Sequence, residues 1–247
     1  SVTGVPVNQM SRMRFRFVMT SDQGLNKDGI AIDDIHIYDN INGIYDGVTM
    51  GPPVTQNMPG GSGWVHFLSG GQLVASVNSP VQAMGNTDGQ AYIHTGAVRV
   101  NSQQYYHNRN ITIKPTTLNL TDSATVRFYF LDSETEALIN ATGCPGCFKP
   151  TMAYQLGVTK YSDADDGLEN GTLADNNRDN YLFINSSKTK IVPFDKGYYA
   201  EFKVKDFSEF WLNNGGINFN QPLPAQLISF TARKKNGKDV LAEWATA

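Results

Sequence analysis

Apolar and polar residues alternate with a period of two along most of this chain, and this alternation constrains its fold more than any other feature. Phe15 and Phe17 alternate with arginines near the start, and Val126, Phe128 and Phe130 do the same in a later segment. Successive side chains of a β-strand point to opposite faces of its sheet. The pattern therefore predicts strands with one face buried in a core.

Strands are predicted at residues 64–68, 72–77, 90–100, 105–113, 125–130, 152–160, 181–184, 191–194, 200–205 and 226–233. Turn-forming clusters such as residues 59–63 and 213–216 separate them. One short loop helix is expected at residues 133–139. Many short strands at this spacing predict an all-β chain of antiparallel β-sandwich modules, jelly-roll or immunoglobulin-like. The predicted core includes Phe15, Phe17, Ile32, Ile35, Val126, Phe128, Phe130, Phe202 and Phe210.

Composition excludes several classes of protein without naming a chemistry. The 247 residues include 23 Gly but only 17% charged residues, which disfavours helical bundles and disorder. A net charge of −3 lacks the basic excess of a nucleic-acid-binding protein. No apolar run approaches the roughly 18 residues that a membrane span requires. We therefore expect neither a nucleic-acid partner nor a membrane span.

An irregularity interrupts the alternation at Asp33 and Asp34. Ile30 and Ile32 share one face, whereas Ile35 falls in the opposite phase. One inserted residue would restore a common face, as a β-bulge does, and it could direct both carboxylates at a cation. A solvated bulge whose carboxylates accept from nearby backbone N–H groups is the simpler interpretation.

The first segments resemble a known family. Arg-Phe-Arg-Phe at 14–17, followed by Asp-Gly-Ile-Ala-Ile-Asp-Asp-Ile at 28–35, resembles the closing strands of MAM-like, concanavalin-like jelly rolls. The resemblance covers about residues 12–39. Because a jelly roll needs about eight strands, it implies that most of that module precedes Ser1.

The other end of the chain is similar to a different module. Residues 222–232, Pro-Leu-Pro-Ala-Gln-Leu-Ile-Ser-Phe-Thr-Ala, resemble the opening of the fibronectin-III-like module in type IX secretion cargo proteins of Bacteroidota. Residues 241–247 resemble that module's second strand. The runs at 63–67, 108–110, 126–130, 156–161 and 207–211 resemble the modules that precede this opening.

These resemblances together imply three parts. Residues 1–50 would be closing strands of a jelly roll, residues 51–220 the main β-sandwich module, and residues 221–247 a linker with the first strands of a fibronectin-III-like module. A secreted or outer cell-surface location follows. The expected partners are other domains of the same polypeptide, with secretion proteins, cell-surface proteins or glycans as further candidates.

Cys144 and Cys147 flank Pro145-Gly146 and are the sharpest local motif. In an exported chain two cysteines at the corners of a turn are expected to form a disulfide. A redox role would place the first cysteine at a helix N-terminus beside a βαβ unit, which Phe148 and the residues after it do not suggest. A zinc site would need a second pair of ligands.

The most acidic stretch is residues 162–179. If the chain binds an ion, we expect structural calcium, because clustered carboxylates suit hard cations. The candidate ligands are Asp163, Asp165, Asp166 and Asp175, or Asp33 and Asp34 at the bulge. A solvated acidic loop is the simpler interpretation, since the spacing departs from the EF-hand pattern.

Catalysis has little support, so we expect a protein that is not an enzyme. His36, His66, His94 and His107 occur singly, and pairs such as Glu134 with Glu136 are usually solvated. No nucleophile elbow or phosphate-binding loop is present in the sequence.

The preferred function is therefore a non-catalytic spacer or adhesion module. The alternatives are a carbohydrate-binding module of a secreted hydrolase and an accessory segment of a secreted peptidase. Carbohydrate binding would use the flat faces of exposed aromatic rings. The candidates are Tyr105, Tyr106, Tyr198, Tyr199, Trp64 and Trp211, and one tyrosine of each adjacent pair is expected to face outward.

Overall fold

The computed structural model describes residues 42–48, 52–61, 63–117, 119–216, 227–234 and 240–246. All of them lie within the unit Tyr38–Ala247, one of two into which the chain divides. The predicted core residues Phe15, Phe17, Ile32 and Ile35 lie outside the described residues, as do Asp33 and Asp34. Each part of the chain is therefore considered by itself.

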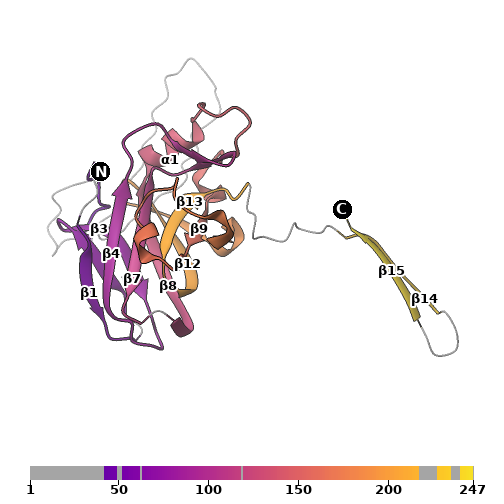
Figure 1. Ribbon diagram of the computed structural model, residues 1–247, viewed down its shortest axis with the longest axis horizontal. Coiled ribbons are helices and arrows are strands. Elements are labelled where there is room, and N and C mark those ends of the chain that lie inside the picture. The colour runs from indigo at the N-terminus through magenta and orange to yellow at the C-terminus, as the bar shows by residue number, and fades with distance from the viewer. Residues whose placement is uncertain are drawn as a thin grey trace, which may run out of the picture. The chain divides into compact units, whose positions relative to one another are not determined.

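Two antiparallel sheets form the main body (Figure 1). The six-stranded sheet has the order β1 (Val54–Met58), β4 (Gly85–Ile93), β7 (Arg109–Pro115), β13 (Glu209–Asn213), β9 (Gly157–Tyr161) and β10 (Tyr181–Ile184). The five-stranded sheet has the order β11 (Lys190–Phe194), β12 (Gly197–Asp206), β8 (Asn119–Leu131), β3 (Gln72–Asn78) and β2 (Val65–Ser69). The chain is thus an all-β sandwich, as the alternation predicts.

Smaller elements join these strands. β5 (Arg99–Asn101) and β6 (Gln104–Tyr106) form a short hairpin, and β14 (Leu227–Lys234) pairs with β15 (Val240–Thr246) in another. The helix α1 (Asp132–Ile139) directly follows β8. Short 3-10 helices among the described residues are η2 (Ala153–Gln155), η3 (Asp166–Leu168), η4 (Arg178–Asn180) and η5 (Ser186–Lys188). In the described part of the chain no helix has the length and apolar character needed to cross a membrane.

The core lies between the two sheets. Phe202 of the five-stranded sheet meets Phe210 of the six-stranded sheet with ring centroids 5.3 Å apart. Val126, Phe128 and Phe130 are also buried in this core, which confirms the predicted core residues that the structure describes. Removing such apolar surface from water is the main favourable contribution to folding.

Both outer faces carry a second, smaller apolar cluster. On the five-stranded sheet, Ile44 packs with Leu73 and Tyr129, and the backbone N–H of Tyr45 donates to the Leu73 carbonyl at 3.0 Å. Ile44 falls within residues 1–50, which the resemblance assigns to a preceding jelly roll, and that assignment stays a prediction. On the six-stranded sheet, the cluster consists of Tyr106, Tyr161, Leu173, Tyr181 and Trp211.

Several strand bounds differ from the predicted ones. The strand expected at residues 90–100 ends at Ile93, and residues 153–155 form η2 instead of a strand. The strand expected at 105–113 is divided between β6 and β7. No strand is predicted at β13, whose five residues are all buried in the structure. β1 is likewise an additional strand, whose residues are mostly polar. α1 confirms the expected helix at residues 133–139.

Shortening Phe210 tests the contact between the sheets. Phe210→Ala should lower the free energy of unfolding by about 3–5 kcal/mol, because it leaves a cavity between closely packed rings. Leu182→Ala is the control, since Leu182 is 47% exposed and should cost far less. Urea unfolding of both variants gives the comparison. Equal losses would contradict a core centred between the two sheets.

Candidate functional site

The outer face of the six-stranded sheet holds a buried carboxylate, Glu209. Phe210 points into the core, so the alternation of β13 turns Glu209 to the opposite face. Its oxygens accept from Asn110 Nδ2 at 2.7 Å, from the Gly171 backbone N–H at 2.7 Å and from Asn176 Nδ2 at 3.2 Å. Gly171 and Asn176 belong to the loop between β9 and β10, residues 162–180, here called the β9–β10 loop. Glu209 therefore fastens this loop to the sheet.

Burial raises the pKa of Glu209 to about 7, although hydrogen bonds from Asn176 and Gly171 and the charge of Arg99 act in the opposite direction. The side chain is fully buried. Its donors are neutral amides, which stabilise a carboxylate less than a directly paired cation would. Glu209 therefore titrates near neutral pH.

Arg99 lies beside this carboxylate at the start of β5. Its Nη1 donates to Asn110 Oδ1 and to the Gly171 carbonyl, both at 3.1 Å, and its Nη2 donates to the His107 carbonyl at 2.9 Å. The guanidinium carbon stands 4.2 Å from the ring centroid of Trp211. Burial lowers the pKa of Arg99 to about 9, against the charge of Glu209.

Gly171 links the two charged groups, because its N–H binds Glu209 and its carbonyl binds Arg99. Its φ of +86° favours glycine, and a Cβ there would lie 2.2 Å from the ring of Tyr92. The loop therefore approaches the sheet as closely as it does only with glycine at this position.

A groove of about 520 Å³ opens between the start of β5 and the β9–β10 loop. Arg99, Val100 and Asn101 line one side, and residues 171–174 line the other. Asn101 Nδ2 donates to the Leu173 carbonyl at 3.1 Å and ties the two sides together. We call this hollow the Arg99 groove.

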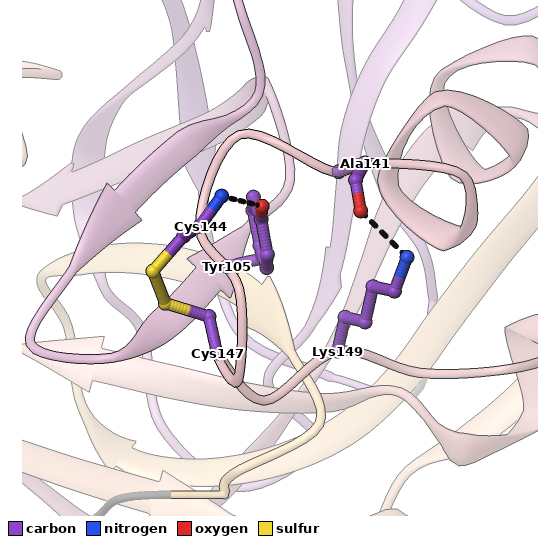
Figure 2. Close-up of a disulfide and its surroundings, with 5 residues drawn as sticks. All are labelled: Tyr105, Ala141, Cys144, Cys147 and Lys149. Carbon is purple, nitrogen blue, oxygen red and sulfur yellow. Dashed lines mark hydrogen bonds between the residues drawn. A yellow bond between two sulfur atoms is a disulfide. The ribbon is translucent and has the colours of Figure 1, made fainter.

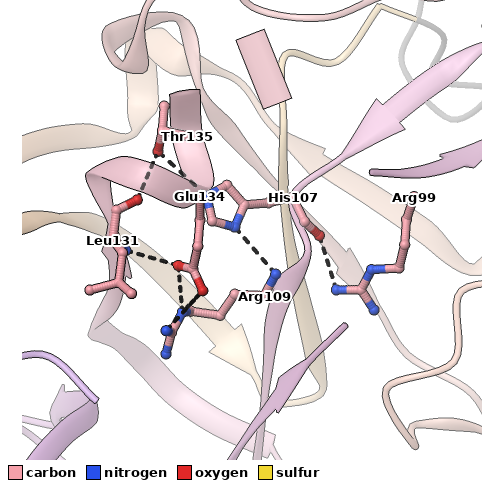
Figure 3. A network of polar contacts seen from close by, with 6 residues as sticks. All are labelled: Arg99, His107, Arg109, Leu131, Glu134 and Thr135. Atoms are coloured by element: carbon pink, nitrogen blue, oxygen red, sulfur yellow. Dashed lines mark hydrogen bonds and ion pairs between the residues drawn. The ribbon is translucent and has the colours of Figure 1, made fainter. Parts of the chain in front are cut away.

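A second buried ionic centre attaches α1 to the six-stranded sheet (Figure 3). Arg109 Nε donates to Glu134 Oε2 and Arg109 Nη2 to Glu134 Oε1, both at 2.9 Å. Glu134 also accepts from the Leu131 backbone N–H at 2.9 Å. Burial would raise the pKa of Glu134, but the positive charge of Arg109 prevails and lowers it. The prediction that Glu134 is solvated is wrong, because Glu134 forms an ion pair with the buried Arg109.

His107 supports the same centre and is fully buried. Its Nδ1 accepts from the Arg109 backbone N–H at 3.3 Å, which leaves the ring proton on Nε2, 3.4 Å from Thr135 Oγ1 (Figure 3). Burial lowers the pKa of His107 to about 4, against the charge of Glu134. The ring is therefore neutral at physiological pH and packs against Phe130.

The predicted calcium ligands accept hydrogen bonds from the β9–β10 loop and its flanking strands. Asp163 accepts from Tyr161 Oη at 2.8 Å and from Asn180 Nδ2 at 2.7 Å. Asp165 accepts from the Gly167 N–H at 2.9 Å and Asp175 from Asn170 Nδ2 at 2.9 Å.

Asp166 contributes its backbone carbonyl, which accepts from Lys114 Nζ at 2.8 Å, and its side chain is exposed. Within the described residues, His, Cys, Asp and Glu side chains form no group of three or more that could hold a metal ion. Calcium binding by these residues stays a prediction, and Asp33 and Asp34 lie outside the described part.

Cys144 and Cys147 form a disulfide, as predicted (Figure 2). The Cys144 N–H donates to Tyr105 Oη, and Lys149 Nζ donates to the Ala141 carbonyl at 2.6 Å across the same loop. The Phe148 N–H then donates to the Gln103 carbonyl at 2.8 Å. The disulfide therefore holds the loop that follows α1 against the β5–β6 hairpin.

Three of the six aromatic residues proposed for sugar stacking are buried, whereas Trp64, Tyr198 and Tyr199 are partly exposed. Tyr105 and Tyr106 are both buried, one in the main core and one in the outer cluster, so the expectation of an outward ring is wrong there. Trp211 is fully buried. Trp64 is partly exposed, with the guanidinium of Arg127 over its ring at 3.8 Å.

No protein-family model matches the chain, and a search of curated proteins also finds no match. The resemblances stated for residues 12–39 and 222–247 therefore stay predictions.

Neutralising Glu134 tests the buried ionic centre. Glu134→Gln keeps the shape of the side chain but leaves Arg109 as a buried cation without its counter-ion. The free energy of unfolding should therefore fall by about 3–5 kcal/mol. Glu201→Gln is the matched control, because the Arg127–Glu201 pair is about a quarter exposed on each side and should lose at most about 1 kcal/mol. Similar small losses in both variants would show that Arg109 does not depend on Glu134.

The raised pKa of Glu209 predicts that the free energy of unfolding depends on pH. A carboxyl whose pKa rises from 4.5 to about 7 on folding binds more protons in the folded chain between these values. Its contribution to stability is therefore present below pH 4.5 and is lost as pH rises through 7. Relative to Glu209→Gln, the wild type should lose up to about 3 kcal/mol across this window.

Chemical unfolding from pH 4.5 to 8 measures this difference. The titrations of all other groups cancel when the free energies of the wild type and Glu209→Gln are subtracted. One of them is His107, whose lowered pKa makes stability rise with pH. A wild-type-minus-variant difference that does not change with pH would contradict the raised pKa of Glu209.

Proposed function

We propose that this chain is a non-catalytic β-sandwich region of a secreted or cell-surface multidomain protein and acts as a spacer or adhesion module. One observation supports this most directly: its buried ionisable groups join one part of the chain to another. Glu209 binds the β9–β10 loop, and Arg109 with Glu134 binds α1. These contacts give a rigid body with fixed loops, which is what a spacer or a binding scaffold requires.

The segment that leads into the sandwich is also held in place. Ile44 is fully buried against the five-stranded sheet, and its N–H donates to Asp195 Oδ2 at 2.8 Å. Two residues later Asp46 pairs with Lys196 and accepts from Gln72 Nε2 at 2.8 Å. A chain that enters its module through such contacts cannot swing freely at that point, and this favours the role of a spacer.

The disulfide supports the proposed location. Disulfides persist in oxidising compartments and are rare in reduced ones. Closing a ring as small as that between Cys144 and Cys147 contributes only about 2 kcal/mol in the chain-entropy model. The bond therefore serves to fix a loop in an environment where it survives.

The redox state of the cysteines in the source cells tests this proposal. Intact cells are treated with a membrane-impermeant amine-reactive label and lysed in a thiol-alkylating reagent, and the chain is then analysed by mass spectrometry. We expect Cys144 and Cys147 to be unalkylated and exposed lysines such as Lys203 and Lys205 to carry the label. Alkylated cysteines on unlabelled protein would overturn the extracellular assignment.

A further inference from the structure

The Arg99 groove is the cavity whose chemistry the proposed function leaves unused. Eight residues line it, including one arginine and no acidic residue. Its volume of about 520 Å³ falls within the range of about 300–1,000 Å³ typical of small-ligand sites. The groove is lined by Arg99, a half-buried cation that has no direct counter-ion among the described residues.

Arg99 makes no ion pair with any carboxylate in the described part of the chain. Its hydrogen bonds go to an amide oxygen and two backbone carbonyls, and its buried Nε has no hydrogen-bond partner. Arg109 shows the contrast, because Glu134 binds two of its nitrogens directly. A buried guanidinium normally obtains such a partner, because desolvating it alone is costly.

Glu209, the carboxylate near Arg99, does not form a direct ion pair with it. Asn110 stands between the two groups, accepting from Arg99 through Oδ1 and donating to Glu209 through Nδ2. Glu209 also accepts from the Gly171 N–H and from Asn176 Nδ2. An anionic group entering the groove would give Arg99 the charged partner that the protein itself places one amide away.

The rest of the lining favours a sugar over a simple anion. Val100 is exposed and offers apolar surface to the groove, whereas Thr172 and His94 are exposed and can hydrogen-bond to hydroxyl groups. A sugar acid presents a carboxylate, hydroxyl groups and an apolar ring face together. We propose that the Arg99 groove binds the uronic acid residue of an acidic glycan, with its carboxylate at Arg99 and its hydroxyls toward Thr172 and His94.

Calorimetric titration of the whole chain with an oligogalacturonate tests the proposal, with a neutral galacto-oligosaccharide of equal length and sodium sulfate as comparisons. We expect the uronate to bind at least about tenfold more tightly than either, as a charge-assisted contact implies. Equal affinity for acidic and neutral sugars, or no binding of either, would overturn the proposal. Sulfate binding as tightly as the uronate would overturn the assignment of a sugar.

Two sets of variants locate the binding. Arg99→Gln should abolish uronate binding, with thermal unfolding as the check that the variant folds. If it does not fold, Thr172→Asp and Thr172→Asn still decide the question, because they differ only in charge at an exposed position of the groove. The aspartate should weaken binding by at least about tenfold and the asparagine by less than twofold. Equal effects of the two would place the ligand elsewhere.

This inference extends the proposed function by naming a ligand class for the binding scaffold. The titration uses purified protein, so its failure would leave the extracellular assignment intact. Alkylated cysteines in cells would equally leave the binding result unaffected.

Discussion

The attachment of the β9–β10 loop to the six-stranded sheet depends on Glu209. Trp211, Tyr161 and Tyr181 on that sheet join Leu173 of the loop in one apolar cluster. The loop can cover them only if its backbone and amide groups find partners on the sheet, because buried polar groups without hydrogen bonds are costly. Glu209 supplies two of these acceptor contacts from one side chain, to the Gly171 N–H and to Asn176 Nδ2. Its burial and its raised pKa are thus the cost of organising a polar loop over an apolar surface.

The buried Arg109 and the half-buried Arg99 reach their neighbouring carboxylates in opposite ways. Arg109 meets Glu134 directly through two of its nitrogens, and the lowered pKa of Glu134 keeps that pair charged. Arg99 instead reaches Glu209 through Asn110, and burial lowers the pKa of the arginine and raises the pKa of the glutamate. The direct pair is a permanent attachment for α1. The separated pair keeps two poorly compensated charges beside a groove, and such an arrangement is typical of sites that receive a ligand.

Much of the fold could be predicted from the sequence, whereas the polar sites mostly could not. Alternation identified Val126, Phe128 and Phe130 because each polar neighbour marks the other face of the strand. The same alternation could have predicted that Arg109 is buried, because Arg109 lies two residues before Ile111 in its strand and points to the same, inner face. The burial of Glu209 could not be predicted in this way, because it is caused by a loop some forty residues earlier in the sequence. The turn around Cys144 could be predicted because all of its determinants are local.

Gly171 makes loop docking and the Arg99 groove interdependent. The Gly171 N–H donates to Glu209, and the Gly171 carbonyl accepts from Arg99. Neither charged group can therefore change its partners without moving the wall of the groove. A proton on Glu209 removes negative charge near Arg99 and increases the attraction of that guanidinium for an outside anion. By thermodynamic linkage, a bound anion must in turn raise the proton affinity of Glu209. The polar contacts that close the loop and the cation that lines the groove thus form a single coupled system.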